Sequence, residues 1–274
     1  VFAEYKPHVV FHAAAYKHVP LMEDFPTQAI MANVLGTKNM ADMAVKYHAE
    51  RFVMISTDKA VNPTNVMGAS KRIAEIYVQS LFLKQVQQDT NCTKFITTRF
   101  GNVLGSNGSV VPFFKKQIAK GGPVTVTHPD IIRYFMTIPE ASCLVLEAAT
   151  LGNGGEIFCF DMGHPVRIAD LAKNMIRLAG FVPGKDIEII YTGLRPGEKL
   201  YEELLNQKET TLPTSNKKIL VAKVREYDFD VVAQQIDEII REARIGRVFP
   251  VVQKMKDIVP EFKSKNSVYE QLDK

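Results

Sequence analysis

Three short apolar runs alternate with longer stretches of helical spacing along the first part of the chain. The runs lie at residues 9–11, 51–55 and 94–98, and their length suits strands buried on both faces of a sheet. Apolar residues then recur at three- to four-residue intervals over 26–47, 68–87 and 110–118, which predicts helices. Strands and helices that alternate in this way favour a right-handed parallel sheet of the doubly wound type.

The elements become shorter and more mixed from residue 123 onward. Strands are predicted at 124–127, 132–137, 156–161, 187–191 and 218–224, helices at 139–149, 168–178 and 230–243, and a further element at 200–205. We therefore predict a sheet domain over 1–122 and a smaller mixed α/β lobe over 123–262, some segments of which return to the core. Residues 263–274 are polar, and we expect a frayed tail there.

The composition is that of an ordinary globular protein. The chain has 274 residues, with 46% hydrophobic and 23% charged residues and a net charge of +4. The lysines and arginines are scattered, which argues against nucleic acid as a partner. The three cysteines have no metal-ligand or disulfide spacing, so we expect no metal site and a reducing compartment. No apolar run is long enough to span a membrane.

Polar residues of different proton chemistry follow the predicted strand 51–55. Thr57, Asp58 and Lys59 come directly after it, where open α/β sheets bind their ligands. A helix begins near residue 68, and Met67 and Lys71 are four positions apart, so they share one helical face. The alternative for Asp58 and Lys59 is a solvated surface pair.

Small and polar residues follow the other two predicted strands. Ala13 and Ala14 follow the first strand and could admit a flat cofactor, although a tight turn uses the same residues. A lone histidine such as His12 is more often structural than catalytic. The glycine- and asparagine-rich loop 99–108 follows the third strand, and its donors suit phosphate or sugar oxygens.

These motifs together resemble the nucleotide-sugar 4,6-dehydratases of the capsule and flagellin-glycan type, a branch of the extended short-chain dehydrogenase/reductases. The resemblance rests on five stretches in order, which are 12–23 (HAAAYKHVPLME), 33–37 (NVLGT), 56–60 (STDKA), 99–103 (RFGNV) and 195–199 (RPGEK). It implies an NAD-binding Rossmann-type domain and UDP-N-acetylglucosamine as the substrate. We also expect a homo-oligomer.

Two departures from the family pattern stand out. The dinucleotide fingerprint GxGxxG is absent, and the chain starts without Met in what reads as the end of a helix, so we expect it to begin inside a domain. In the family, long members carry N-terminal membrane helices, which would place the protein at the cytoplasmic side of the inner membrane. Met67 stands where the family usually has Tyr, as in its long forms, and a thioether has no proton to exchange near neutral pH.

The resemblance also implies roles for individual residues. Asp58 would be the acid and Lys59 the base of an elimination, Thr57 would bind the C4 oxygen, and Lys71 would bind the nicotinamide ribose. Lys59 would then need a lowered pKa, although a neighbouring Asp favours the ion pair. Further residues assigned to the cofactor are His12, Ala13, Ala14, Lys17 and Asn33. Those assigned to the substrate are Asn102, Arg133, Arg195 and Glu198, with a plain surface role as the alternative for Arg133.

Two other functions stay open. A nucleotide-sugar C4 epimerase uses the same scaffold, but it needs no acid–base pair after Thr57. A binding or assembly module, or an inactive fragment, is the second alternative, and an upstream GxGxxG segment would argue against it.

Overall fold

A six-stranded sheet forms the centre of the computed structural model, which describes residues 1–88, 92–203, 210–223 and 225–273. Its strand order is β1-β2-β3-β8-β12-β11. The first four strands are parallel, whereas β12 and β11 form an antiparallel hairpin at one edge. The bounds are β1 Val9–His12, β2 Arg51–Ile55, β3 Lys94–Arg99, β8 Ile157–Phe160, β11 Thr210–Pro213 and β12 Ile219–Lys223. The predicted α/β fold with a mostly parallel sheet is confirmed.

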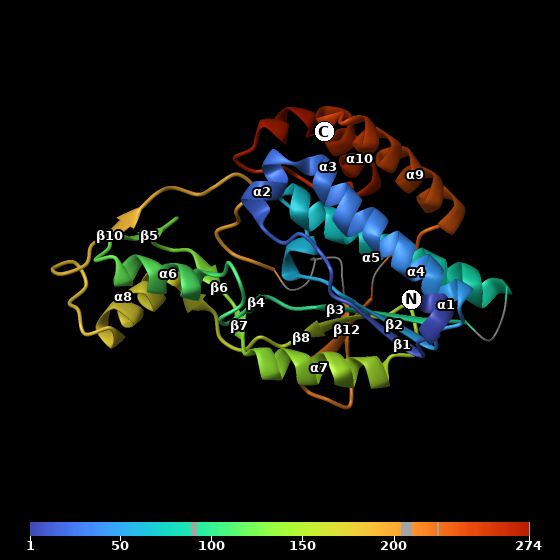
Figure 1. Ribbon diagram of the computed structural model, residues 1–274, viewed down its shortest axis with the longest axis horizontal. Helices are drawn as coiled ribbons and strands as arrows, with labels where there is room; N and C mark the ends of the chain where they lie inside the picture. Colours follow the sequence, from blue (N-terminus) through green and yellow to red (C-terminus); the bar gives the residue numbers. More distant parts are fainter. Residues whose placement is uncertain (89–91, 204–209, 224, 274) are drawn as a thin grey trace.

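Helices cover both faces of this sheet (Figure 1). Helix α7 (Ile138–Leu151) lies on one face, and α4 (Gly36–Lys46) and α5 (Val66–Gln88) lie on the other. Helices α9 (Phe229–Ile245) and α10 (Val248–Ile258) add an outer layer over α5. Because α5 is enclosed between the sheet and these helices, its residues 66–81 are all buried. No described helix is long and apolar enough to cross a membrane.

The stretch predicted as one helix over 26–47 is divided into three parts. Helix α3 (Pro26–Ala29) and α4 flank a π-helix, Ile30–Leu35. A π-helix widens the turn by one residue and often occurs at functional sites. Here it contains Asn33, whose buried amide bonds the backbone of Tyr16 and the Ser70 hydroxyl.

A smaller lobe packs around its own apolar core. It contains α6 (Val110–Ala119), α8 (Ile168–Leu178) and the parallel pair β5 (Val124–Val126) and β10 (Ile189–Tyr191). The single strand predicted at 132–137 is instead β6 (Ile132–Arg133) and β7 (Phe135–Met136). The two pair with different partners, β9 (Val166–Arg167) and β4 (Asn102–Val103), because the chain changes sheets at Tyr134. The predicted element at 200–205 falls partly outside the described residues.

The prediction of a frayed tail after residue 263 is wrong. Residues Val268–Leu272 form a 3-10 helix, and Ser267 and Glu270 make a capping box at its start. Tyr269 is buried and donates to the Glu23 carbonyl oxygen at 3.1 Å, and Ser267 Oγ donates to Glu23 Oε2 at 2.6 Å. The polar residues that suggest disorder in the sequence therefore have partners on α2 (Val19–Asp24).

The same tail segment also holds a loop of the smaller lobe. The Gly197 amide donates to the Lys265 carbonyl at 2.7 Å, and the Gly197 carbonyl accepts from the side chains of Thr64 and Asn65. The Lys265 amide in turn donates to the Thr64 carbonyl at 3.2 Å. The tail thus fixes the loop 193–199 against the segment that precedes α5.

Candidate active site

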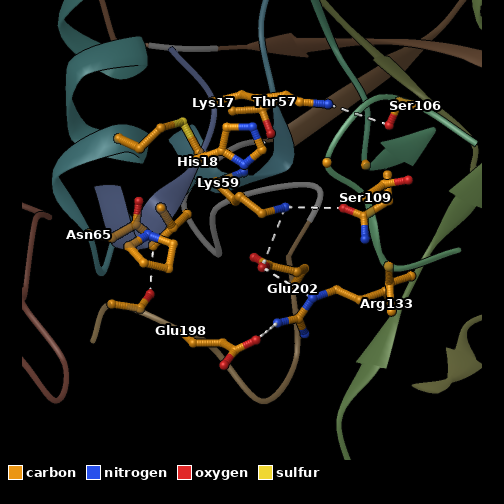
Figure 2. Close-up of a pocket in the computed structure, with 18 of the residues that line it drawn as sticks. Lys17, His18, Thr57, Lys59, Asn65, Ser106, Ser109, Arg133, Glu198 and Glu202 are labelled. Atoms are coloured by element: carbon orange, nitrogen blue, oxygen red, sulfur yellow. Dashed lines mark hydrogen bonds and ion pairs between the residues drawn. The ribbon is translucent and has the colours of Figure 1, made fainter. Parts of the chain in front are cut away.

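A cleft of about 680 Å³ opens at the carboxyl ends of the parallel strands, between the sheet and the smaller lobe. Segments that follow β1, β2 and β3 line one side, and residues of α6, β5 and the loop 192–202 line the other. Figure 2 shows Lys59 in this cleft with Glu202 and Arg133 opposite it. This edge of the sheet is where the sequence placed the polar residues.

The residues that follow β2 form a compact turn. Thr57 caps the 3-10 helix Asp58–Ala60, its hydroxyl donating to Asp58 Oδ1 at 2.8 Å. The same carboxylate oxygen accepts from Lys59 Nζ at 2.9 Å. The start of α5 packs directly on this turn, because a Cβ added to Gly68 would lie 2.1 Å from the Lys59 carbonyl oxygen. Thr57, Asp58 and Lys59 are therefore held as one rigid unit.

Asp58 and Lys59 form an ion pair in which the carboxylate is buried and the ammonium is partly exposed. Asp58 is only 1% exposed, and its second oxygen, Oδ2, has no hydrogen-bond partner among the described residues. Burial lowers the pKa of Lys59, but the carboxylates of Asp58 and Glu202 outweigh burial, so the pKa of Lys59 is raised. Lys59 is thus a stable cation, whereas the role of a free base would require a lowered pKa.

Glu202 is a site residue that the sequence did not reveal. Its Oε1 lies 3.6 Å from Lys59 Nζ and 3.7 Å from Arg133 Nε. The residue is buried and lines the cleft, although it is separated from Lys59 by more than a hundred positions. The one indication in the sequence is that Glu202 closely follows the RPGEK stretch at 195–199.

Glu198 lies between two arginines, so positive and negative side chains alternate along this wall of the cleft. Glu198 Oε1 lies 3.5 Å from Arg133 Nη2 and 3.1 Å from Arg195 Nη2. Arg133 is buried and also donates to the carbonyl oxygens of Ile132, Leu200 and Lys199. The Arg195 side chain, in contrast, is 56% exposed. Arg195 is therefore the more accessible guanidinium for an anionic group.

Met67 and Lys71 both line the cleft from the first two turns of α5. Burial lowers the pKa of Lys71 to about 8, against the opposing effect of Glu75. His12 lies deeper, with Nε2 2.9 Å from Thr37 Oγ1. Its pKa is lowered to about 4, first by burial and then by the charge of Lys71. The imidazole is therefore neutral at physiological pH.

The structure separates the candidate cofactor residues into two groups. Ala13 and Lys17 line the cleft, and Lys17 Nζ reaches Ser106 Oγ at 3.5 Å. His12, Ala14 and Asn33 do not line it. Asn33 holds the loop after β1 in place instead. Among the candidate substrate residues, Asn102 lines the cleft and its Oδ1 accepts from Lys59 Nζ at 3.4 Å.

A second buried ion cluster lies beneath the turn and was not predicted from the sequence. Glu75 is fully buried and accepts from Arg72, Arg99 and Ser56. The pKa of Glu75 is lowered to about 2, because the charges and hydrogen bonds of these partners outweigh the raising effect of burial, the largest single contribution. The cluster joins the ends of β2 and β3 to α5 below the Thr57 turn.

Two known proteins are similar in sequence to most of this chain. The chain is 57% identical over 242 residues to the capsular polysaccharide biosynthesis protein CapD of Staphylococcus aureus, covering 88% of this chain and 39% of CapD. It is 40% identical over 200 residues to a UDP-glucose 4-epimerase of Rickettsia canadensis, covering 73% of this chain and 56% of that protein. The chain thus spans about two fifths of the length of CapD.

Solved structures share the fold. Pen from Bacillus thuringiensis superposes with a TM-score of 0.70 at 35% identity, covering 78% of this chain and 65% of Pen. A UDP-glucose 4-epimerase of Thermus thermophilus, solved in complex with NAD, superposes with a TM-score of 0.60 at 22% identity, covering 72% and 68% of the two chains. A family model described as polysaccharide biosynthesis protein matches residues 1–224. The chain therefore belongs to the polysaccharide biosynthesis protein family.

Proposed function

We propose that this chain carries the acid–base pair of an NAD-dependent 4,6-dehydratase that acts on UDP-N-acetylglucosamine. The observation that supports this most strongly is the Asp58–Lys59 ion pair, in which Asp58 is buried and Lys59 lines the cleft together with Met67 and Lys71. Burying the Asp58 carboxylate is costly in free energy, so such a pair rarely serves stability alone. Its position at the carboxyl edge of a parallel sheet favours a catalytic use.

NAD is the proposed cofactor, and the residues present fit one side of it. Ala13 and Ala15 line the cleft with small side chains, and Lys71 lines the same cleft. NAD is also bound by the Thermus epimerase of the same fold. Ala13, Lys17 and Lys71 would hold the cofactor. When bound, NAD supplies a hydride acceptor that oxidises C4 and later returns the hydride to C6.

The chain's own residues supply the proton transfers. The hydrogen bond of 2.9 Å between Lys59 Nζ and Asp58 Oδ1 offers a direct path for one proton. Its transfer turns the ion pair into a neutral amine and a carboxylic acid. Lys59 would then remove the C5 proton, and Asp58 would protonate the departing C6 hydroxyl as water leaves. Both protonation states needed for elimination thus arise from one internal transfer.

The remaining residues orient the substrate. Thr57 Oγ1 lies next to Asp58 and can bond the C4 oxygen, and Arg195 offers a bidentate donor to the diphosphate. Met67 cannot exchange a proton, so the face of C5 nearest to Met67 receives none from it. Lys59 would therefore remove and return the C5 proton on one face. The product is expected to be a UDP-linked 4-keto-6-deoxy sugar of xylo configuration.

The test is to incubate the protein encoded by the complete gene with UDP-N-acetylglucosamine in D₂O and to follow the product by NMR. We expect a C6 methyl signal, deuterium at C5 and retained configuration before any spontaneous epimerisation. A first product of arabino configuration would refute retention but leave the dehydration intact. The absence of any C6 methyl signal would refute dehydration itself.

A C4 epimerase is the second candidate, because the 40% identical Rickettsia relative is named a UDP-glucose 4-epimerase. An epimerase changes only C4 and leaves C5 and C6 untouched. It would convert the substrate to its C4 epimer without solvent deuterium at C5. The same NMR experiment therefore separates the two activities.

A further inference from the structure

Glu202 occupies the wall of the cleft opposite the Thr57 turn (Figure 2). It follows the loop 193–199 and comes from a different part of the chain than Asp58 and Lys59. Its side chain is only 3% exposed, so it faces the cleft from a nearly dry position. Carboxylates are rarely buried to this degree unless both oxygens are satisfied.

Within the described part of the chain, only one oxygen of Glu202 has charged neighbours. Oε1 lies between Lys59 and Arg133, at 3.6 Å and 3.7 Å, distances that indicate electrostatic attraction rather than hydrogen bonds. Oε2 is fully buried and has no hydrogen-bond partner among the described residues. Asp58 shows the same division, since Oδ1 is bonded and Oδ2 is not. Each of the two carboxylates that attract Lys59 thus has one oxygen without a donor among the described residues.

Glu202 lines the cleft, whereas Asp58 does not, so the unpaired oxygen of Glu202 indicates which ligand group fits there. A carboxylate only accepts hydrogen bonds, so the missing partner must be a donor such as a hydroxyl or an amide N–H. A diphosphate is excluded from this position by charge repulsion, and the exposed Arg195 offers it a better place. The neutral, donor-rich part of a nucleotide sugar is its sugar ring.

We propose that Glu202 binds the sugar ring of the substrate, with Oε2 accepting a hydrogen bond from a sugar hydroxyl or from the amide N–H of the 2-acetamido group. This role rests on the proposed nucleotide-sugar substrate. Glu202 would then select the sugar while Arg195 binds the diphosphate. Its other oxygen would keep Lys59 placed between two carboxylates as the sugar enters.

The test compares binding of UDP and UDP-N-acetylglucosamine by calorimetry, using the protein encoded by the complete gene. Glu202→Gln should weaken binding of the UDP-sugar roughly 10- to 100-fold, the range for a lost hydrogen bond to a charged group. UDP lacks the sugar, so its affinity should stay within about twofold. Glu203→Gln is the matched control, because Glu203 is the adjacent carboxylate, is 45% exposed and bonds Asn62 instead.

The outcomes separate the two levels of the proposal. Equal weakening of UDP and UDP-sugar, or no weakening of either, would overturn the Glu202 role. A wild-type protein that binds neither ligand would overturn the nucleotide-sugar function, and the Glu202 role with it. UDP-glucose identifies the donor: a loss confined to UDP-N-acetylglucosamine indicates the amide N–H, and an equal loss for both sugars indicates a hydroxyl. A Glu202→Ala variant with an unchanged melting temperature should show the same selective loss.

Discussion

The charges of the cleft alternate from residue to residue, beginning with Asp58 and Lys59 and continuing through Glu202, Arg133 and Glu198 to Arg195. Each of these charges lies beside a charge of opposite sign, so the three negative and three positive groups compensate one another. Any ligand that takes a partner from one member changes the next. Proton transfer from Lys59 to Asp58 is therefore expected to depend on what occupies the cleft.

The first prediction concerns the acid–base pair itself. Lys59→Ala should abolish exchange of the C5 hydrogen with D₂O, and Asp58→Asn should block formation of the C6 methyl while still permitting some NADH to form. Loss of one positioned acid or base costs about 10²–10⁴-fold in rate. Lys173→Ala, on the exposed surface of α8, is the control and should leave turnover unchanged. Near wild-type turnover of both site variants would remove the pair from the mechanism.

The second prediction concerns His12 and the pH dependence of stability. Folding lowers the pKa of His12 from 6.5 to about 4. Below pH 6.5 the unfolded chain takes up a proton that the folded chain does not, so this contribution to stability is complete above pH 6.5 and is lost toward pH 4. The shift corresponds to roughly 3 kcal/mol.

Urea unfolding of the wild type and His12→Gln at pH 7 and pH 4.5 measures this contribution. The wild type should lose more free energy of unfolding between the two pH values than the variant. All other titrating groups are common to both proteins, including Glu23, whose pKa burial raises. Equal pH dependence of the two proteins would contradict the prediction.

The acid–base pair could be predicted from the sequence because its residues are adjacent and follow a recognisable strand. Glu202 could not, because it reaches Lys59 only through the fold. The same holds for the Glu75 cluster, in which Arg72 and Glu75 look like a surface pair on a helix. Only the enclosure of α5 on all sides makes this pair buried.

At the scale of elements, the start of α5 packs tightly against the Thr57 turn. They touch at Gly68, where a side chain has no room because the Lys59 backbone is in the way. The glycine near this helix start therefore serves close packing. The helix cannot move away from the turn without displacing Met67 and Lys71 from the cleft.

The third prediction follows from this contact. Gly68→Ala should destabilise the fold by about 1–3 kcal/mol, the usual cost of overpacking, and should lower turnover as the turn shifts. Gly36→Ala is the matched control, since Gly36 is also helical but its added Cβ would approach nothing closer than 3.9 Å. It should be neutral or stabilising by up to about 1 kcal/mol. Thermal unfolding that shows equal effects for both would contradict the prediction.

Elements with a strong apolar period were predicted well, and the helix at 168–178 has the predicted bounds. The π-helix was not, because a single widened turn leaves the overall apolar spacing nearly unchanged. Helix α10 was also missed, although Val251, Val252, Met255 and Ile258 recur at helical spacing. The strand 132–137 was predicted as one, because its split depends on two partners distant in sequence.

At the scale of the whole molecule, the parallel core follows from the alternation of strands and helices. The antiparallel hairpin of β11 and β12 could not be predicted in this way, because apolar spacing does not indicate the direction of a strand. After residue 137, α7, β8, β11, β12, α9 and α10 belong to the main sheet and its covering helices, whereas α8 and β10 belong to the smaller lobe. The chain thus leaves the main sheet to form the smaller lobe and then returns to the sheet, and the cleft lies between these two parts.

The fourth prediction concerns the tail that holds the loop 193–199. Removing residues 263–274 should raise hydrogen exchange of the Gly197 amide, because its acceptor, the Lys265 carbonyl, is lost. The Val53 amide in the central strand β2 is the control and should stay protected. Unchanged exchange at Gly197 would show that the tail does not hold this loop.

The contact between Gly197 and Lys265 also sets an order of assembly during translation. The ribosome makes the strands, the Thr57 turn and Arg195 before it makes the residues that fix the loop 193–199. A nascent chain can therefore complete its sheet and its acid–base pair while the loop beside them still lacks its anchor. The wall that carries Arg195 and Glu198 reaches its final position only after residue 265 has left the exit tunnel.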